Sequence, residues 1–190
     1  NGTLNVLSDL NYDNFIFAST GAAAQPSSPY ATSKVVAEQC VRQHCNLSQV
    51  DHTIFRFYNV IGSAGYPPTN PDGLFYNLIK AKWTGVFNLY GNDYNTPDGT
   101  PVRDYVHVME ICYAIRNAIE NPANTPVENL GHCRGHSVKE MAETFQKVNN
   151  CEFKINYVPR REGDLESSVL DNVSSYMEEL YSFEDLMKCV

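Results

Sequence analysis

A short apolar run followed closely by a strong helix start is the feature that most restricts how this chain can fold. Residues 14–19 read Asn-Phe-Ile-Phe-Ala-Ser and precede the hydroxyl residue Thr20, a pattern that predicts a buried β-strand with a polar carboxyl end. Ser28 is a favourable N-cap residue and Pro29 suits the first helical position, so we expect a helix to begin there and to end near residue 45. A strand, a short connection and a helix make up the repeating unit of an α/β fold.

The same alternation of strands and helices continues along the chain. Runs of β-branched and aromatic residues predict strands, and apolar residues at helical spacing predict helices. A capping box of Ser137 and Glu140 marks one helix start. The predicted strands cover residues 52–57, 86–90, 127–130 and 153–158, the predicted helices cover residues 1–12, 74–83, 106–119 and 138–148, a terminal helix starts at residue 182, and residues 59–73 are expected to form a loop. This order indicates the α/β class with a largely parallel sheet.

The helix that starts at Pro29 has apolar positions from which its buried side can be predicted. These positions are Val35, Val36, Cys40 and Val41. They leave the polar residues Glu38, Gln39 and Arg42 for other surfaces of the helix.

Composition and charge exclude several classes of partner. The 190 residues carry 14 Lys and Arg against 22 Asp and Glu, a net charge of −8, whereas nucleic-acid-binding domains usually carry a basic surface. No apolar run approaches the length of a membrane span and no signal peptide opens the sequence, so we expect neither nucleic acid nor a membrane as a partner. The six cysteines form no C-x-x-C pair and are expected to be reduced thiols of a cytoplasmic protein. His132 and Cys133 have no second ligand pair at suitable spacing, so no metal site is expected.

Tyr30 and Lys34 are the most reactive pair that the sequence offers. They are four residues apart in the helix predicted after Pro29, which places them on one face, one turn apart. An ammonium group beside a phenol favours the phenolate, so Tyr30 is a candidate general acid or base near neutral pH. Because Tyr-x-x-x-Lys is a common pattern, a purely structural role is the alternative for an isolated match.

The pair is accompanied by other motifs in a recognisable order. A strand ending in Ser-Thr, followed by Tyr-x-x-x-Lys at a helix start, resembles the short-chain dehydrogenase/reductase superfamily. Five further motifs follow at residues 56–62 (Arg-Phe-Tyr-Asn-Val-Ile-Gly), 90–94 (Tyr-Gly-Asn-Asp-Tyr), 98–108 (Asp-Gly-Thr-Pro-Val-Arg-Asp-Tyr-Val-His-Val), 129–131 (Asn-Leu-Gly) and 159–165 (Pro-Arg-Arg-Glu-Gly-Asp-Leu). In this order, and through nearly the whole chain, they resemble the UDP-glucose 4-epimerases of that superfamily.

The resemblance implies a partial Rossmann-like, mostly parallel sheet with a smaller C-terminal substrate-binding lobe. Residues 1–62 would form the C-terminal part of an NAD-binding domain, and residues 63–190 would form mainly the lobe, with segments that return to the sheet. The sequence contains no GxxGxxG, the glycine-rich turn that brings the cofactor pyrophosphate to a helix N-terminus in this superfamily. We therefore expect this chain to correspond to the part of the fold that follows the glycine-rich half.

The resemblance also implies an NAD-dependent reaction that inverts the C4 hydroxyl of a UDP-sugar. Tyr30 would remove the hydroxyl proton, Lys34 would support Tyr30 and bind the nicotinamide ribose, and the Thr20 hydroxyl would bridge Tyr30 and the sugar oxygen. Phe57 and Tyr58 would lie beside the nicotinamide, so these five residues form the expected NAD site. For Thr20, capping of the strand end is the structural alternative. No carboxylate follows Thr20, where sugar-nucleotide dehydratases of the superfamily carry an acidic pair, so dehydration is disfavoured.

Further residues match the family's contacts to the UDP diphosphate. Asn59 would donate a hydrogen bond, and Arg103 and Arg160 would clamp the phosphate oxygens with paired donors. Asp164 would hydrogen-bond the uridine ribose or a neighbouring arginine. The structural alternatives are a strand-end turn for Asn59 and a solvated surface charge for each arginine.

The uridine and sugar pockets correspond to two other stretches. Leu74, Phe87, Asn88 and Tyr90 match the uridine-contacting segment, although apolar residues at strand spacing more often belong to the core. Ser168 falls where these enzymes place a pocket-wall residue. A small residue there leaves room for an N-acetyl group, so UDP-GlcNAc is an expected substrate besides UDP-glucose and UDP-galactose.

The resemblance further implies a homodimer, formed through the helices at residues 1–12 and 29–45. Three alternatives stay open. The chain is a catalytically inactive remnant that binds UDP-sugars, or it has a neighbouring activity such as another NDP-sugar epimerase or a reductase, or it complements a separately encoded N-terminal half.

Overall fold

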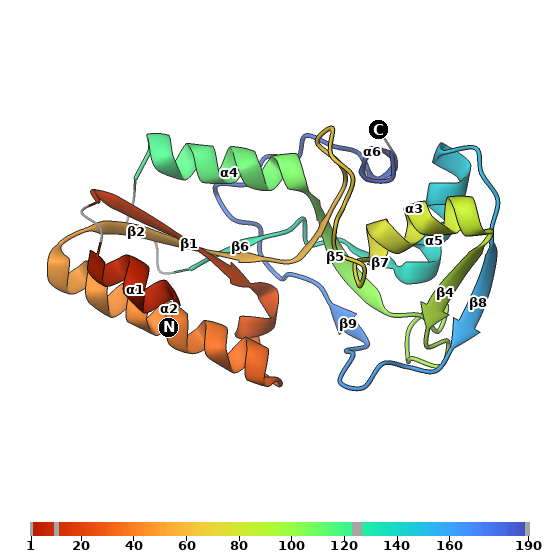
Figure 1. Ribbon diagram of the computed structural model, residues 1–190, viewed down its shortest axis with the longest axis horizontal. Coiled ribbons are helices and arrows are strands. Elements are labelled where there is room, and N and C mark those ends of the chain that lie inside the picture. Colours follow the sequence, from red (N-terminus) through yellow and green to blue (C-terminus); the bar gives the residue numbers. More distant parts are fainter. Residues whose placement is uncertain (1, 10–11, 123–126, 189–190) are drawn as a thin grey trace. The chain divides into compact units, whose positions relative to one another are not determined.

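The structure is a computed structural model that describes residues 2–9, 12–122 and 127–188 (Figure 1). The chain forms two compact units. The first comprises Asn1–Tyr58, Ile111–Leu130 and Asn172–Glu178, and the second comprises Asn59–Glu110, Gly131–Asp171 and Glu179–Val190. The first change of unit falls after Tyr58, and the chain returns to the first unit twice.

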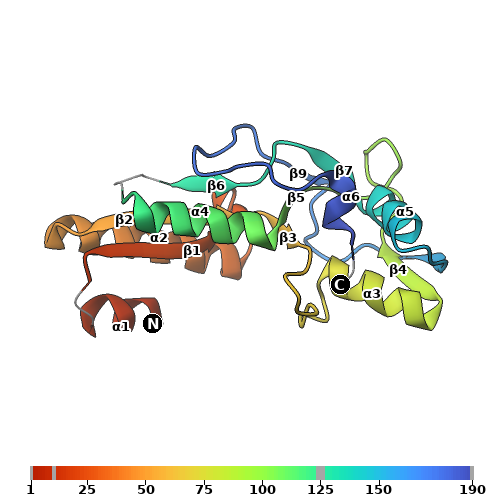
Figure 2. The same cartoon turned by 90° about the horizontal axis from the view of Figure 1, so that it is seen from above.

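The first unit is a three-stranded parallel sheet with helices on both faces. Its elements are α1 (Gly2–Asp9), β1 (Asn14–Thr20), the 3-10 helix η1 (Gly21–Ala24), α2 (Pro29–Ser48), β2 (Asp51–Phe57), most of α4 (Val108–Glu120) and β6 (Glu128–Leu130). The strand order is β1-β2-β6. Thr20 pairs with Phe57, and Phe57 pairs with Leu130, so the carboxyl ends of all three strands meet at one edge. Within this unit, α1 and α2 cover one face of the sheet and α4 covers the other (Figure 2).

Helix α2 begins where its caps predict. The Ser28 hydroxyl accepts the amide hydrogen of Ala31 at 3.2 Å, and Pro29 is the first helical residue. The helix continues to Ser48, beyond the predicted end, and closes at Gln49 in the left-handed conformation with φ of 57°. A hydrophobic core then fixes α2 against α1 and the sheet. It consists of Leu7, Phe17, Val41, Cys45 and Ile54.

The buried side of α2 differs from its predicted apolar side. Val41 is fully buried, but Val36 is 53% exposed. Glu38, predicted on another surface, is only 1% exposed. This part of the prediction is wrong because Glu38 finds hydrogen-bonding partners on both neighbouring strands, which removes the usual penalty of a buried charge.

The second unit contains a mixed sheet and a separate parallel strand pair. Its elements are β3 (Asn59–Ile61), α3 (Leu74–Thr84), β4 (Val86–Tyr90), β5 (Val102–His107), β7 (Gly135–Ser137), α5 (Val138–Val148), β8 (Lys154–Val158), β9 (Ser167–Ser168) and α6 (Phe183–Leu186). β5 pairs in parallel with β3 and β9 and antiparallel with β7, while β4 pairs in parallel with β8. The capping box predicted at α5 is present, and α6, the terminal helix expected from residue 182, also begins with one. A core around Leu78, Leu89 and Phe145 holds the unit together.

The predicted helix at residues 106–119 begins too early. Residues 102–107 form strand β5, and α4 starts only at Val108. His107 caps this helix, because its Nδ1 accepts the amide hydrogen of Met109 at 3.2 Å and its own amide donates to Glu110 Oε2 at 2.9 Å. Burial lowers the pKa of His107, which keeps Nδ1 unprotonated and able to accept that bond.

The remaining differences are small. The α/β class with parallel sheets is confirmed. The helix predicted at residues 1–12 is described at Gly2–Asp9, and residues 1, 10 and 11 lie outside the described part. The loop predicted at residues 59–73 contains the short strand β3. None of the helices described is long and apolar enough to span a membrane.

Candidate active site

Three of the predicted cofactor residues meet at the carboxyl edge of the first unit's sheet. Thr20 ends β1 and Phe57 ends β2, and the two are register partners. Tyr58 follows directly, and its amide donates to the Leu130 carbonyl at 3.2 Å. Ligands of open α/β sheets bind at this edge, so the sheet brings these residues to the position that binding requires.

Thr20 has a capping role, the structural alternative given for it above. Its Oγ1 accepts the amide hydrogen of Ala22 at 3.4 Å, at the start of η1. A hydroxyl offers two acceptor lone pairs and one donor, so this bond leaves the hydroxyl proton available. Capping and ligand binding are therefore compatible at Thr20.

Helix α2 presents Tyr30 and Lys34 one turn apart, as predicted. The Tyr30 side chain is 58% exposed, so its phenol is open to a ligand. The Lys34 ammonium donates to the Ala18 carbonyl at 3.0 Å and lies 5.0 Å from the centre of the Phe17 ring. The lysine is thus anchored on β1, two residues before Thr20.

Gly21 is a residue whose role sequence reasoning missed. A Cβ atom on Gly21 would lie 2.7 Å from Cε2 of Tyr58, so the tyrosine ring packs directly against the glycine backbone. From the sequence we noted only that this position does not carry a carboxylate. The close approach supplies a physical reason for that absence, because any side chain at position 21 would have to displace Tyr58.

In the second unit, three predicted substrate residues come together around β5. Arg103 Nη2 donates to Asp164 Oδ1 at 2.6 Å, and Arg103 Nη1 donates to the Val102 carbonyl at 2.8 Å. The Arg103 side chain is only 12% exposed. Ser168, on β9, is the register partner of Arg103. Asp164 thus bonds a neighbouring arginine, one of the two partners expected for it.

Asn59 is held by the same strand. Its Nδ2 donates to the Asp104 carbonyl at 3.1 Å, next to its register partner Tyr105. An amide nitrogen carries two hydrogens, so this bond leaves one donor for a ligand. The geometry is compatible with the predicted contact to a diphosphate.

The predicted uridine residues of β4 do not all share one face. Phe87 is 3% exposed and packs against Phe153, with ring centres 5.9 Å apart. Its side chain belongs to the core, the alternative given above for apolar residues of this segment. Asn88 and Tyr90 lie on the exposed face, because successive strand residues point to opposite sides. Leu74 packs against the edge of the same core.

Two neighbouring arginines behave differently. Arg160 Nε donates to Asp93 Oδ1 at 2.6 Å, its Nη2 donates to the Asp93 carbonyl, and its guanidinium lies 4.0 Å from the centre of the Tyr94 ring. Arg161 lies 4.1 Å from the centre of the Tyr90 ring, on the exposed face of β4. Arg160 was predicted as a phosphate clamp; its Nε and Nη2 are engaged with Asp93, which leaves Nη1 for a ligand. Arg161, which the sequence prediction missed, is the freer of the two.

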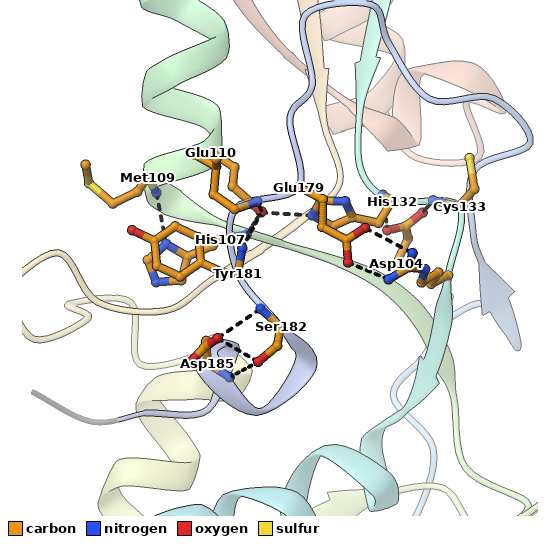
Figure 3. A network of polar contacts seen from close by, with 12 residues as sticks. Asp104, His107, Met109, Glu110, His132, Cys133, Glu179, Tyr181, Ser182 and Asp185 are labelled. Atoms are coloured by element: carbon orange, nitrogen blue, oxygen red, sulfur yellow. Dashed lines mark hydrogen bonds and ion pairs between the residues drawn. The ribbon is translucent and has the colours of Figure 1, made fainter.

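A buried polar network surrounds Asp104, His107 and Glu110 at β5 and the start of α4 (Figure 3). Asp104 is fully buried, and its carboxylate accepts the amide hydrogens of His132 and Cys133, each at 2.8 Å. Glu110 is 1% exposed; it accepts the amides of Leu180 at 2.9 Å and His107 and bonds His132 Nε2 at 2.9 Å. These carboxylates join β5, the segment after β6 and the C-terminal segment of the unit.

The same network sets the charge of its members. Burial alone raises the pKa of Glu110, but the hydrogen bonds from His132 and from backbone amides outweigh it and hold the pKa below its usual range. The Glu110 carboxylate in turn raises the pKa of His132. Within the described residues, no group of three or more His, Cys, Asp or Glu could hold a metal ion.

Comparison with known proteins defines the family. Residues 3–131 match the model of the NAD dependent epimerase/dehydratase family. The chain belongs to this family. The match covers β1, the Tyr30–Lys34 helix and β5, so it includes most of the elements that carry the predicted site.

The relatives within this family include UDP-glucose 4-epimerases. The enzyme of Haemophilus influenzae is 33% identical over 157 residues, which cover 76% of this chain and 46% of that protein. The enzyme of Yersinia pestis is 35% identical over 153 residues, or 74% of this chain and 45% of that protein. The chain thus spans about half the length of the curated relatives it matches.

Solved structures of the family share the fold. A UDP-glucose 4-epimerase from Bifidobacterium longum, in complex with NAD+ and UDP, is 25% identical with a TM-score of 0.81 and covers 97% of this chain and 64% of its own. A UDP-Glc/GlcNAc 4-epimerase from Campylobacter jejuni is 27% identical with a TM-score of 0.71, covering 97% of this chain and 66% of its own. The Rossmann-like class and the resemblance to UDP-glucose 4-epimerases are confirmed.

Proposed function

We propose that this chain is the part of a UDP-sugar 4-epimerase that carries the catalytic base and most substrate contacts, and that it interconverts UDP-glucose and UDP-galactose. One observation carries the proposal. Thr20 and Tyr58 stand at the carboxyl edge of a parallel sheet, and Lys34 ties the helix that presents Tyr30 to the strand that ends in Thr20. The names of the family and of its UDP-glucose 4-epimerase members support the reaction class.

The side chains divide the proton chemistry among them. Tyr30 is the base that takes the proton of the sugar 4-hydroxyl, and as an acid it returns that proton. The Lys34 ammonium, one turn along the same face of α2, would bind the nicotinamide ribose. The Thr20 hydroxyl, which keeps its donor, bridges Tyr30 and the sugar oxygen.

The residues present fit the nicotinamide end of NAD. Tyr30 is open to a ligand, Lys34 lies on the same helix face, and Tyr58 packs on the backbone of Gly21, the residue after Thr20. These residues, together with Phe57, would hold the nicotinamide and its ribose. When bound, NAD supplies the hydride acceptor and donor for the sugar C4 carbon. Because the sequence has no GxxGxxG turn, no residue is assigned to the pyrophosphate.

The second unit supplies the proposed contacts to UDP. Arg103, Arg161 and Asn59 donate to the diphosphate, with Asp164 holding Arg103 in place. Asn88 and Tyr90 contact the uridine, and Leu74 and Arg160 contribute to the shape of the same surface. Ser168 lines the sugar pocket and leaves space for an N-acetyl group, so UDP-GlcNAc is a second substrate.

Titration of the purified 190-residue chain with NAD tests the proposal first. Isothermal titration should give a saturable binding curve, and the NAD-loaded chain should convert UDP-glucose to UDP-galactose in a coupled assay. If neither NAD binding nor turnover is detected, this chain alone is not an epimerase.

A second candidate function follows from the length of the match. Since the chain aligns with 46% of its Haemophilus influenzae relative, it could act by binding UDP-sugars without turnover, or by complementing a separate polypeptide. Binding of UDP in the absence of turnover would favour the first. Appearance of turnover on co-expression with a glycine-rich N-terminal half would favour the second.

We also propose a cytoplasmic homodimer that uses α1 and α2. These helices pack against each other and carry exposed apolar side chains, namely Leu4, Val6, Val36 and Leu47. Exposed apolar side chains that gather on one surface are typical of protein interfaces. The described cysteines are free thiols, namely Cys40, Cys45, Cys112, Cys133 and Cys151.

A further inference from the structure

Glu38 is a buried carboxylate on the helix that presents the proposed base. It continues the row of Tyr30 and Lys34 along α2, four residues beyond the lysine. Its carboxylate accepts the Ser19 hydroxyl at 2.5 Å and the Arg56 fork through Nε at 2.8 Å and Nη2 at 2.6 Å. With the side chain only 1% exposed, the charge is neutralised almost entirely by these partners.

The partners of Glu38 occupy one row of the sheet. Ser19 and Arg56 are register partners on β1 and β2, and the next row consists of Thr20 and Phe57. Glu38 therefore binds both strands in the row directly before the one in which the proposed site begins.

Lys34 makes the preceding attachment on β1. Its ammonium bonds the Ala18 carbonyl at 3.0 Å, while Glu38 bonds the side chain of Ser19. Two successive turns of α2 are thus fixed to two successive residues of β1. This double attachment sets the position of Tyr30 along the strand direction relative to Thr20.

The charge state of Glu38 is consistent with this attachment. Burial by itself raises the pKa of the carboxyl, but the hydrogen bonds from Arg56 and Ser19 outweigh it and hold the pKa below its usual range. Arg42 is a third partner of Glu38, because its Nη2 lies 3.8 Å from the same carboxylate. Glu38 is ionised wherever the proposed reaction would run.

We infer that Glu38 is a positioning residue, which locks the Tyr30–Lys34 face of α2 to the carboxyl ends of β1 and β2. The inference rests on the proposed epimerase function. Glu38 touches neither substrate nor cofactor; it acts through the placement of Tyr30, Thr20 and Tyr58. A displacement of about 1 Å in a catalytic group can reduce a rate about a hundredfold.

The first test separates positioning from stability. Glu38→Gln removes the charge and keeps the size, and Glu120→Gln is the matched control, because it breaks an exposed Glu–Arg pair on α4 of the same unit. Urea unfolding first defines conditions in which all variants are fully folded. There, kcat of Glu38→Gln should fall about tenfold to a hundredfold with KM within about threefold, whereas the control should match the unaltered chain. A folded Glu38→Gln with unchanged kcat overturns the inference.

Ser19→Ala is the second variant, for the case in which Glu38→Gln does not fold. It removes one hydrogen bond to Glu38 and leaves the pair with Arg56 intact. We expect a smaller fall in kcat, again with little change in KM. Equal kcat for Ser19→Ala and the unaltered chain would contradict the role assigned to this row.

A readout without cofactor distinguishes failure of this inference from failure of the proposed function. Amide hydrogen exchange should accelerate in Glu38→Gln at residues 18–20, at Tyr58 and in the first turn of α2, and not in peptides of the second unit. If the unaltered chain shows no turnover but exchange changes in this local pattern, the proposed function fails and the positioning role stands. Exchange that is unchanged, or raised throughout the chain, overturns the positioning role whatever the turnover.

Discussion

Arg103 and Ser168 are register partners on the parallel strands β5 and β9. The arginine proposed for the diphosphate and the residue proposed for the sugar pocket therefore sit side by side on one piece of sheet. Asp164 bonds Arg103 from the segment that leads into β9, which fixes the pair further. A change of size at position 168 thus acts at a defined place relative to the diphosphate.

The first prediction concerns sugar specificity. Ser168→Tyr should lower turnover of UDP-GlcNAc relative to UDP-glucose by about tenfold or more, because a large ring occupies the space of the N-acetyl group. The measurement is the ratio of kcat/KM for the two substrates. Ser167→Tyr is the control, since successive strand residues point to opposite sides. An unchanged ratio in Ser168→Tyr would refute the assignment of the pocket wall.

The second prediction concerns the base. Tyr30→Phe should lower kcat by about a hundredfold to ten-thousandfold, the usual contribution of general acid–base catalysis. The melting temperature should hardly change, because the Tyr30 side chain is 58% exposed. Tyr66→Phe, at an even more exposed tyrosine, serves as the control. Full activity of Tyr30→Phe would exclude this residue as the base.

The third prediction separates the two adjacent arginines. Arg161→Ala should weaken UDP binding by about tenfold or more, as expected for loss of a charge-assisted hydrogen bond. Arg160→Ala should weaken it less, because two of the three guanidinium nitrogens of Arg160 are engaged with Asp93. Titration of each variant with UDP measures both effects. The reverse order would restore Arg160 as the principal clamp.

The fourth prediction concerns pH. The pKa of His132 is raised in the folded chain, so protonated His132 stabilises the fold through its bond to Glu110. This stabilisation is complete below the ordinary histidine pKa of 6.5 and is lost as the pH rises through the pKa of His132 in the folded chain. The pKa of Glu110 is lowered in the folded chain, so its ionised carboxylate stabilises the fold above the ordinary pKa of 4.5. This stabilisation is lost as the pH falls through the pKa of Glu110 in the folded chain. The pair should therefore stabilise the chain most between these limits.

Urea unfolding across a pH series checks this. The charged groups around His132 are Glu110, Asp104 and Glu179, all acidic, so they favour its protonated form. The difference in unfolding free energy between the unaltered chain and His132→Gln should shrink as the pH rises from about 6 to about 9. His44→Gln, on α2 and outside the network, is the control variant. A constant difference for His132→Gln would rule out the titration of this pair.

The fifth prediction concerns assembly. Val36→Asp places a charge on the exposed apolar surface of α2 and should convert the proposed dimer to a monomer in sedimentation velocity. Ile119→Asp, on an equally apolar and exposed site of α4, should leave the dimer intact. If the unaltered chain is monomeric at micromolar concentration, the dimer proposal fails.

The sequence predicted those helices and strands whose caps and apolar residues are neighbours along the chain. The start of α2 at Ser28 and Pro29 and the box at Ser137 depend on neighbours in sequence, so they could be recognised. Strand β5 could not, because its pairing partners lie near residues 60, 136 and 168, and only the folded chain brings them together. Its last two residues therefore looked like the beginning of the helix that follows.

In the candidate site, too, features set by neighbouring residues could be predicted and features set by remote residues could not. The spacing of Tyr30 and Lys34 is a local property and was predicted correctly. The burial of Glu38 depends on Ser19 and Arg56, which are remote in sequence, so its pattern on the helix was misleading. Arg160 and Arg161 are adjacent and chemically identical, and only the presence of Asp93 beside one of them distinguishes their roles.

The contact between Gly21 and Tyr58 constrains the order in which this sequence could diverge. An acidic residue at position 21 would meet the Tyr58 ring at 2.7 Å from its first side-chain carbon. A path toward the acidic pair of the dehydratases would therefore displace the Tyr58 ring, or take a smaller residue at position 58 before, or together with, the carboxylate. The two positions are epistatic, and either substitution can become neutral or harmful depending on which one is already present.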